Sequence, residues 1–150
     1  MRIVLQRVLK SSVIIDNDEK REISQGLNIL VGISENDTKK EVDYLADKCL
    51  GLRIFSDSDD KLNLSVLDIK GEILAISNFT LYGDSRKGKR PSFIKAGKPS
   101  MSKELYEYFV EKLKLSGLTI KTGEFGADME VSIINDGPVT LILDTEEMLK

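Results

Sequence analysis

The chain has 150 residues, enough for one domain that spans residues 1–150 and buries roughly two-thirds of its unfolded surface. Hydrophobic residues make up 41% and charged residues 31%, and the net charge of −3 argues against a protein that coats nucleic acid over its whole surface. No apolar run approaches the ~20 residues that span a bilayer, and Arg2 and Arg7 interrupt the start too early for a signal peptide. We therefore expect a cytoplasmic protein.

The first third of the chain predicts strands followed by one helix. Residues 2–8 and 12–15 have the composition of a first pair of strands, and residues 27–33 are apolar enough for a strand buried on both faces. Thr38 and Glu41 form a capping box, which predicts the start of a helix. Apolar residues then recur at helical spacing until Gly51: Val42, Leu45, Ala46, Cys49 and Leu50.

The remainder predicts more strands and a second helix. Residues 56–60 form an acidic turn that lacks the glycine and the final glutamate of an EF-hand loop, so we expect solvent rather than calcium there. Residues 72–76 follow as a strand, and a helix should open near Ser100 or Ser102 and stop at Gly117. Its buried stripe comprises Leu105, Tyr106, Phe109, Val110 and Leu113, and the last expected strands are residues 118–121, 130–134 and 139–143. Strand pairs with two main helices predict an α+β domain with a largely antiparallel sheet.

Two absences limit the available chemistry. The chain has no histidine, which excludes Ser-His-Asp and Cys-His catalysis and histidine-based zinc sites. Cys49 is the only cysteine, so an intrachain disulfide and a zinc site of paired thiolates are also excluded, and its place on an apolar stripe favours core packing. Any hydrolysis must use carboxylates, hydroxyls, backbone donors, a carboxylate-bound metal or the substrate itself.

A proline interrupts two strand-like segments near the end of the chain. Residues 131–134 and 139–143 are rich in β-branched and aliphatic residues, and the sequence Asn135-Asp136-Gly137-Pro138 lies between them. An Asn-Gly or Asp-Gly pair alone could close a hairpin, whereas Pro138 removes an amide donor and permits a cis peptide bond. Taken alone, this segment predicts a turn.

Polar and aromatic side chains follow the strand at residues 72–76. The sequence continues as Ser77-Asn78-Phe79-Thr80-Leu81-Tyr82. Polar residues at a strand end often face a site, although either hydroxyl could equally be satisfied by nearby backbone groups.

A basic segment follows this strand end. Between residues 83 and 98 there are six cationic residues and one acid, Asp84, which gives a local charge of +5. A glycine-punctuated basic loop can contact phosphates, or it can serve only solubility. Its central cations are Arg86, Lys87, Lys89 and Arg90.

Together these segments resemble the D-aminoacyl-tRNA deacylase family, whose members hydrolyse D-amino acids from mischarged tRNA. The family carries Ser-Gln-Phe-Thr-Leu and Asn-x-Gly-Pro-Val-Thr segments, which stand here at residues 77–81 and 135–140. One departure is Asn78, which is one methylene shorter than the usual glutamine. The likeness covers nearly the whole chain, through residues 6–8, 53–56, 90–93 and 123–129.

The resemblance implies a β-barrel-like core flanked by helices, a two-fold homodimer, and hydrolysis without a cofactor or a metal. It implies a catalytic segment comprising Ser77, Asn78, Phe79 and Thr80. Backbone amides near Phe79 and Thr80 would stabilise the oxyanion, Thr80 would orient water or substrate, and the 2′-hydroxyl of the terminal adenosine would assist the attack. A nucleophilic Ser77 or Thr80 is the alternative, but neither has a histidine to take its proton.

The resemblance also implies that a Gly137-cis-Pro138 unit reaches the opposite subunit's site and rejects L-amino acids. Many D-amino acids, and glycine, should then be accepted. The implied substrate-binding residues are Gly137, Pro138, Asn135, Val139, Thr140, Met129, Phe125 and Arg7, and the implied tRNA-binding residues are Arg86, Lys87, Lys89 and Arg90. Met129 and Phe125 could equally belong to the core. Two alternatives to the enzyme remain: a non-catalytic nucleic-acid-binding module that uses residues 86–90, and a dimeric scaffold without a ligand.

Overall fold

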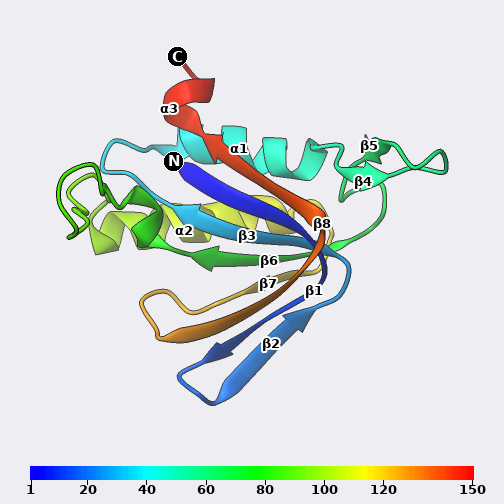
Figure 1. The fold of residues 1–150 in the computed structure, drawn as a ribbon, viewed down its shortest axis with the longest axis horizontal. Coiled ribbons are helices and arrows are strands. Elements are labelled where there is room, and N and C mark those ends of the chain that lie inside the picture. The colour runs from blue at the N-terminus through cyan, green and yellow to red at the C-terminus, as the bar shows by residue number, and fades with distance from the viewer.

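One long strand, β1 (Arg2–Ile15), is the common partner of three other strands in the computed structural model, which describes residues 1–150 (Figure 1). Its first half pairs antiparallel with β3 (Gly26–Gly32), and its second half pairs antiparallel with β2 (Glu19–Ile23). Strand β8 (Met129–Asp144) lies antiparallel to β1 along its whole length. These pairings curl the sheet into a nearly closed, barrel-like shape.

The rest of the main sheet is parallel, so the sheet is mixed, although three of its five strand pairings are antiparallel, as expected. Strand β6 (Glu72–Ser77) runs parallel to β3, and β7 (Ile120–Thr122) runs parallel to β6. The parallel pairings follow from the two main helices. The first helix lies in the connection from β3 to β6 and the second in the connection from β6 to β7, and such a crossover is what parallel neighbouring strands require. The fold is therefore α+β, as expected, with a mixed sheet.

Two main helices cover the sheet, as the sequence predicts. Helix α1 (Lys39–Gly51) begins at the expected capping box of Thr38 and Glu41. Helix α2 (Pro99–Lys114) begins one residue before the earlier of the two expected starts, because proline is well suited to the first helical position. The hydroxyl of Tyr106 ties α2 to the sheet by donating a hydrogen bond of 2.6 Å to the carbonyl oxygen of Ala75 in β6.

The smaller elements complete the chain. A 3₁₀ turn, η1 (Phe79–Tyr82), follows β6, and α3 (Thr145–Met148) follows β8. The acidic turn at residues 57–60 joins β4 (Phe55–Ser56) to β5 (Leu62–Leu64), which form a separate two-stranded sheet. No helix is long and apolar enough to cross a membrane.

The strands differ from the expectations in three places. Residues 2–8 and 12–15 form one continuous strand rather than a pair, and residues 130–134 and 139–143 likewise both belong to β8. Strand β2 escapes prediction because four of its five residues are charged, and only its last residue, Ile23, is buried.

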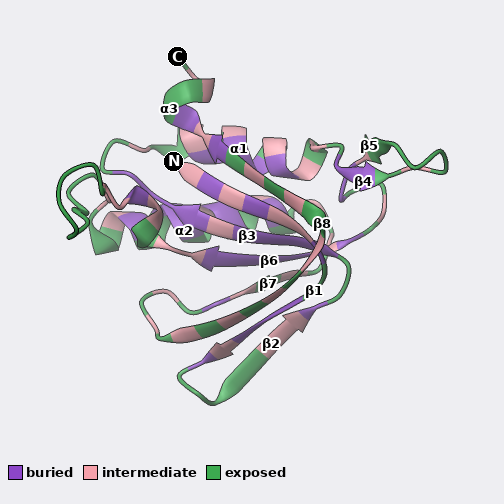
Figure 2. Cartoon of the chain, in the orientation of Figure 1, coloured by how far each residue is buried: buried purple, intermediate pink, exposed green.

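The core has two parts, and β1 contributes to both. The larger cluster contains Ile3 and Leu5 from the first half of β1, whereas the smaller cluster contains Val13 and Ile15 from its second half. A shift in pairing between Val8 and Lys10 reverses which residues point inward, and this lets one strand serve both clusters. Strands β3 and β6 are the most completely buried (Figure 2).

Cys49 lies fully buried in the larger cluster. Burial raises the pKa of its thiol to about 12, so the thiolate is not formed near neutral pH. This agrees with the expected packing role.

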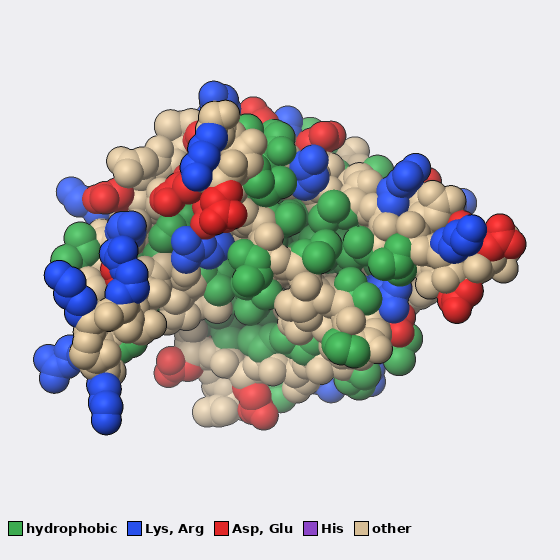
Figure 3. Space-filling view, turned by 45° about the horizontal axis from the view of Figure 1, so that its top comes forward, with side chains coloured by type: hydrophobic (Ala, Val, Ile, Leu, Met, Phe, Trp, Pro, Cys, Tyr) green, Lys and Arg blue, Asp and Glu red, His purple; other side chains and the backbone are tan.

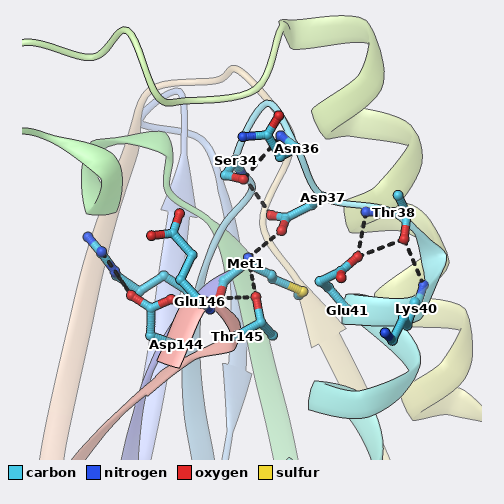
Figure 4. A network of polar contacts seen from close by, with 11 residues as sticks. Met1, Ser34, Asn36, Asp37, Thr38, Lys40, Glu41, Asp144, Thr145 and Glu146 are labelled. Atoms are coloured by element: carbon cyan, nitrogen blue, oxygen red, sulfur yellow. Dashed lines mark hydrogen bonds and ion pairs between the residues drawn. The ribbon is translucent and has the colours of Figure 1, made fainter. Parts of the chain in front are cut away.

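A polar network joins the two ends of the chain (Figure 4). The ammonium group of Met1 donates a hydrogen bond of 2.7 Å to the Thr145 hydroxyl and forms an ion pair with Asp37. Asp37 also accepts a hydrogen bond of 2.6 Å from the amide of Ser34, which anchors the loop that leads into α1.

The close approach of β3 and β6 predicts the effect of one substitution. A Cβ atom added at Gly26 would stand 1.8 Å from the carbonyl oxygen of Glu72, whereas one added at Gly51 would meet nothing within 4 Å. We expect Gly26→Ala to lower the free energy of unfolding by about 1–3 kcal/mol, because the backbone must move apart. Gly51→Ala, the matched control at the end of α1, should leave it unchanged or raise it slightly. Urea unfolding measures both, and equal effects would contradict the close approach.

Candidate functional site

A cavity of about 700 Å³ lies at the carboxyl end of β6. Ser77, Asn78 and Phe79 form one wall, the loop before α2 forms another, and the segment that includes Phe125 and Met129 closes it. The structure therefore brings together five of the residues expected at the site from two distant parts of the sequence. Thr80 is exposed and does not line this cavity.

Asn78 organises the turn that follows the strand. Its side-chain oxygen accepts hydrogen bonds from both the amide (3.2 Å) and the hydroxyl of Thr80, and this caps η1. The Thr80 amide is therefore occupied, whereas the Phe79 amide has no hydrogen-bond partner. Of the two backbone donors expected here, Phe79 alone is available to a ligand.

Aromatic side chains line the cavity on two sides. Phe79 is 58% exposed and packs edge-on against Phe93 at a centroid distance of 5.3 Å. Phe125 lies on the opposite segment and contacts Tyr106 of α2 at a centroid distance of 6.2 Å. An exposed aromatic ring held at a cavity mouth is suited to stacking against a planar ligand such as a base.

The segment at residues 135–140 is a bulge within β8, and not the expected turn between two strands. Thr140 pairs with Gln6 and Asn135 pairs with Val8, so the strand continues in the same direction on both sides. The peptide bond between Gly137 and Pro138 is cis.

The side chain of Asn135 closes this bulge. Its oxygen accepts a hydrogen bond of 2.9 Å from the Val139 amide, and its nitrogen donates to the Val139 carbonyl and to the Thr140 hydroxyl, each at 3.1 Å. The side-chain amide thus takes the place of a backbone partner in the ladder, and Gly137 and Pro138 remain exposed.

Arg7 supports the same bulge from β1. Its Nε donates a hydrogen bond of 2.9 Å to the carbonyl oxygen of Asp136, and its terminal nitrogen donates at 2.9 Å to the carbonyl of Ile54. The guanidinium side chain is only 11% exposed and also lies 3.4 Å from the Asp136 carboxylate. Arg7 thus braces the bulge through the carbonyl oxygen of Asp136 and connects it to the carbonyl oxygen of Ile54.

None of the bulge residues 135–140 lines the cavity of the same chain. The expected substrate-binding residues therefore fall into two separate groups within one protomer. Met129 and Phe125 lie at the cavity, whereas the other expected residues surround the bulge: Gly137, Pro138, Asn135, Val139, Thr140 and Arg7.

The basic loop projects from the end of the molecule nearest η1. Figure 3 shows Lys and Arg side chains gathered at the left edge, where Figure 1 places the segment between η1 and α2. Arg86 is paired with Asp84 at 2.6 Å, and this contact holds the pKa of the Asp84 carboxyl well below its usual range. The other expected cations, Lys87, Lys89 and Arg90, are exposed and form no ion pair.

Sequence reasoning missed several residues of the cavity. Gly97, Lys98, Pro99 and Ser102 line it from the start of α2, and Ile33 lines it from the end of β3. Lys98-Pro99 before a helical pattern is a usable signal for a helix start, but nothing local indicates that this start faces the end of β6.

The geometry defines an α+β protein with a barrel-like sheet and an open cavity at a strand end. The family model described as D-Tyr-tRNA(Tyr) deacylase matches residues 4–144, and the chain belongs to this family.

Among similar proteins, the chain is 56% identical over 146 residues to a D-aminoacyl-tRNA deacylase of Clostridium beijerinckii, covering 97% of this chain and 98% of that one. It is 51% identical over 144 residues to a protein of the same name from an Exiguobacterium species, covering 96% and 98%. Among solved structures, the "c-Myc DNA Unwinding Element Binding Protein" is 41% identical with a TM-score of 0.89, covering 96% of this chain and 98% of that one. A "probable eukaryotic D-amino acid tRNA deacylase" is 16% identical over 95% and 97% of the chains, and its TM-score of 0.84 supports the shared fold.

The hydrogen bonds of Asn135 predict the effect of an isosteric change. Asn135→Asp keeps the acceptor for the Val139 amide but places an oxygen against the Val139 carbonyl. We expect it to lower the free energy of unfolding by about 1–3 kcal/mol at neutral pH. The loss should shrink below about pH 4, where a protonated carboxyl regains a donor. The matched control is Asn17→Asp in the exposed turn before β2, where no side-chain hydrogen bond is lost. Equal losses of stability in urea would contradict the bridging role of Asn135.

Proposed function

We propose that this chain hydrolyses the ester bond between a D-amino acid, or glycine, and tRNA, and so removes wrongly attached amino acids during translation. The observation that carries the proposal is the cavity in which Ser77, Asn78 and Phe79 meet Phe125 and Met129, in a chain that belongs to the deacylase family. Its relatives' names, D-aminoacyl-tRNA deacylase, agree with a hydrolase of this kind.

The backbone supplies the catalytic donor in this proposal. Negative charge develops on the ester carbonyl oxygen during attack by water, and the free amide of Phe79 can stabilise it. A fixed donor of this kind is worth about 3–4 kcal/mol in the barrier. Because the Thr80 hydroxyl donates its proton to Asn78, its oxygen is left to accept a hydrogen bond from water or from the substrate. Ser77 lines the pocket, and the 2′-hydroxyl of the terminal adenosine assists the attacking water.

Chirality is read by the bulge of a second protomer. Gly137 and Pro138 are exposed, are held by Arg7 and Asn135, and lie outside their own cavity, so they are available to a neighbouring copy. In the dimer their main chain forms a wall beside the α-carbon, and nearby carbonyl oxygens hold the ammonium group. An L side chain collides with this wall, whereas a D side chain or a hydrogen does not.

Strand β8 supports a two-fold dimer. It pairs only with β1, so its other edge is open, and it carries two exposed isoleucines, Ile134 (53% exposed) and Ile142 (71%). Hydrophobic side chains also gather in the middle of the face seen in Figure 3. An open edge with apolar side chains is favourable for association with a second copy.

The exposed loop at residues 86–90 contacts the phosphates of tRNA in this proposal. The unpaired Lys87, Lys89 and Arg90 provide the positive charge. This loop, together with the DNA-binding name of the 41% identical structure, also favours a second candidate, a nucleic-acid-binding module without catalysis. That candidate predicts salt-sensitive binding to mischarged tRNA with no loss of the ester.

Incubation with D-tyrosyl-tRNA and L-tyrosyl-tRNA tests the function. We expect rapid release of D-tyrosine and release of L-tyrosine no faster than in buffer alone. Acid-precipitable label measures the ester that remains. Intact D-tyrosyl-tRNA bound to the protein would instead establish the binding module.

Gly137→Ala tests the wall. Gly137 has a φ of +151°, and a Cβ atom there would stand 2.5 Å from the Val139 amide nitrogen, so the bulge must shift. We expect the ratio of D to L hydrolysis rates to fall by about tenfold or more, because small displacements at a reacting centre are costly. The matched control is Gly117→Ala, which also has positive φ (+82°) but lies in the loop after α2 with nothing within 4 Å of the new atom. An unchanged ratio in a folded Gly137→Ala protein would rule out the wall.

A further inference from the structure

The start of α2 forms one end of the cavity. Gly97, Lys98 and Pro99 line it there, and the helix that follows is 16 residues long. The first position, Pro99, has no amide hydrogen, and no side chain caps the helix. The amides of Ser100 and Met101 consequently have no hydrogen-bond partner, and they lie at the positive end of the helix dipole.

A buried hydroxyl lies at the same place. Ser102 is only 7% exposed, it lines the cavity, and its hydroxyl makes no hydrogen bond within the chain. Helical side chains point back toward the helix start, and a Cβ atom added at Gly97 would stand 2.7 Å from the Ser102 oxygen. Glycine at position 97 thus leaves this hydroxyl open to the cavity. The Ser102 oxygen is not one of the fully enclosed polar atoms without a partner, so it can be reached from the cavity and can bond to a ligand or water there.

The charges at this end favour an anion. Lys98 is exposed, forms no ion pair, and stands immediately before the first turn of α2. A cation beside a helix start is unfavourable by itself, because it adds to the positive end of the dipole, and a bound anion would relieve this. Asp128 is the one carboxylate in the cavity lining, and it comes from the segment before β8 rather than from α2.

We propose that the start of α2 is a subsite for an anionic oxygen group. Ser102 and Lys98 line the cavity and supply a hydroxyl donor and the charge, and the unpaired amides of Ser100 and Met101 lie beside them in the first turn of the helix. Given the proposed function, on which the identity of the ligand rests, two sources carry this chemistry. One is a phosphate of the tRNA 3′ end, and the other is the side-chain carboxylate of a D-aspartyl or D-glutamyl ester.

Binding of adenosine 5′-monophosphate and of adenosine, measured by calorimetry, tests the phosphate source. We expect the monophosphate to bind about tenfold more tightly than adenosine to the wild-type chain, the gain typical of hydrogen bonds to a charged group. Ser102→Ala and Lys98→Gln should each reduce this preference severalfold, where the preference is the ratio of monophosphate affinity to adenosine affinity in the same variant. The matched control is Lys103→Gln, which removes the same charge from α2 at a residue that faces a different cavity.

A second arm tests the carboxylate source. Hydrolysis of D-aspartyl-adenosine and of D-asparaginyl-adenosine is compared in the wild-type chain and in Lys98→Gln. A lower KM for the aspartyl ester that is lost in Lys98→Gln would show that the subsite binds the substrate's side-chain carboxylate. The subsite would be overturned if the wild-type chain showed neither preference, or if the preference that it showed were unchanged in Lys98→Gln. Calorimetry needs no hydrolysis, so a chain that is inactive on D-tyrosyl-tRNA can still show the subsite, and an active chain can lack it.

Discussion

The pairing of β1 with β8 is the constraint on which the rest of the structure depends. The two strands run antiparallel from Arg2 and Asp144 at one end to Ile15 and Met129 at the other. Because β1 also pairs with β2 and β3, this ladder connects the end of the chain to every other part of the main sheet. It places Met129 at the cavity and the exposed Gly137-Pro138 corner about eight residues further along the same strand.

The cavity depends on the crossovers that make β3, β6 and β7 parallel. Parallel strands bring the carboxyl ends of β3 and β6 to the same edge, where Ile33 and Ser77 both line the cavity. Helix α2 follows β6 and returns its own start to this edge, and the bond from Tyr106 to Ala75 fixes its distance from the sheet. Strand ends and a helix start thus meet at one place, which concentrates unpaired backbone donors there.

Much of the local structure was predictable from the sequence, because local rules decide it. The capping box at Thr38, the buried strand that follows Gly26 and the packing of Cys49 all follow from short-range patterns. The bulge after Ile134 could not be predicted from the sequence, because a polar segment between two strand-like runs looks the same whether the chain reverses or continues. Only the pairing of both runs with β1 decides this, and that information is not local.

The candidate site was predictable in part for the same reason. Ser77 to Phe79 stand out because polar residues follow an apolar strand, but Ser102 looks like an ordinary helix residue until α2 is placed beside β6. Its burial and its lack of a partner are properties of the folded chain alone.

The side chain of Asn135 closes the bulge at its base, so the exposed Gly137-Pro138 corner lies outside the ladder that holds the barrel together. From Asn135 to Thr140 the chain advances five residues while its partner moves two, from Val8 to Gln6. The surplus of three corresponds to Asp136, Gly137 and Pro138, the residues that stand outside the ladder. The pairs Gln6 with Thr140 and Val8 with Asn135 hold the ladder on both sides of these three residues, so the length and conformation of the exposed corner are not set by the alignment of the two strands.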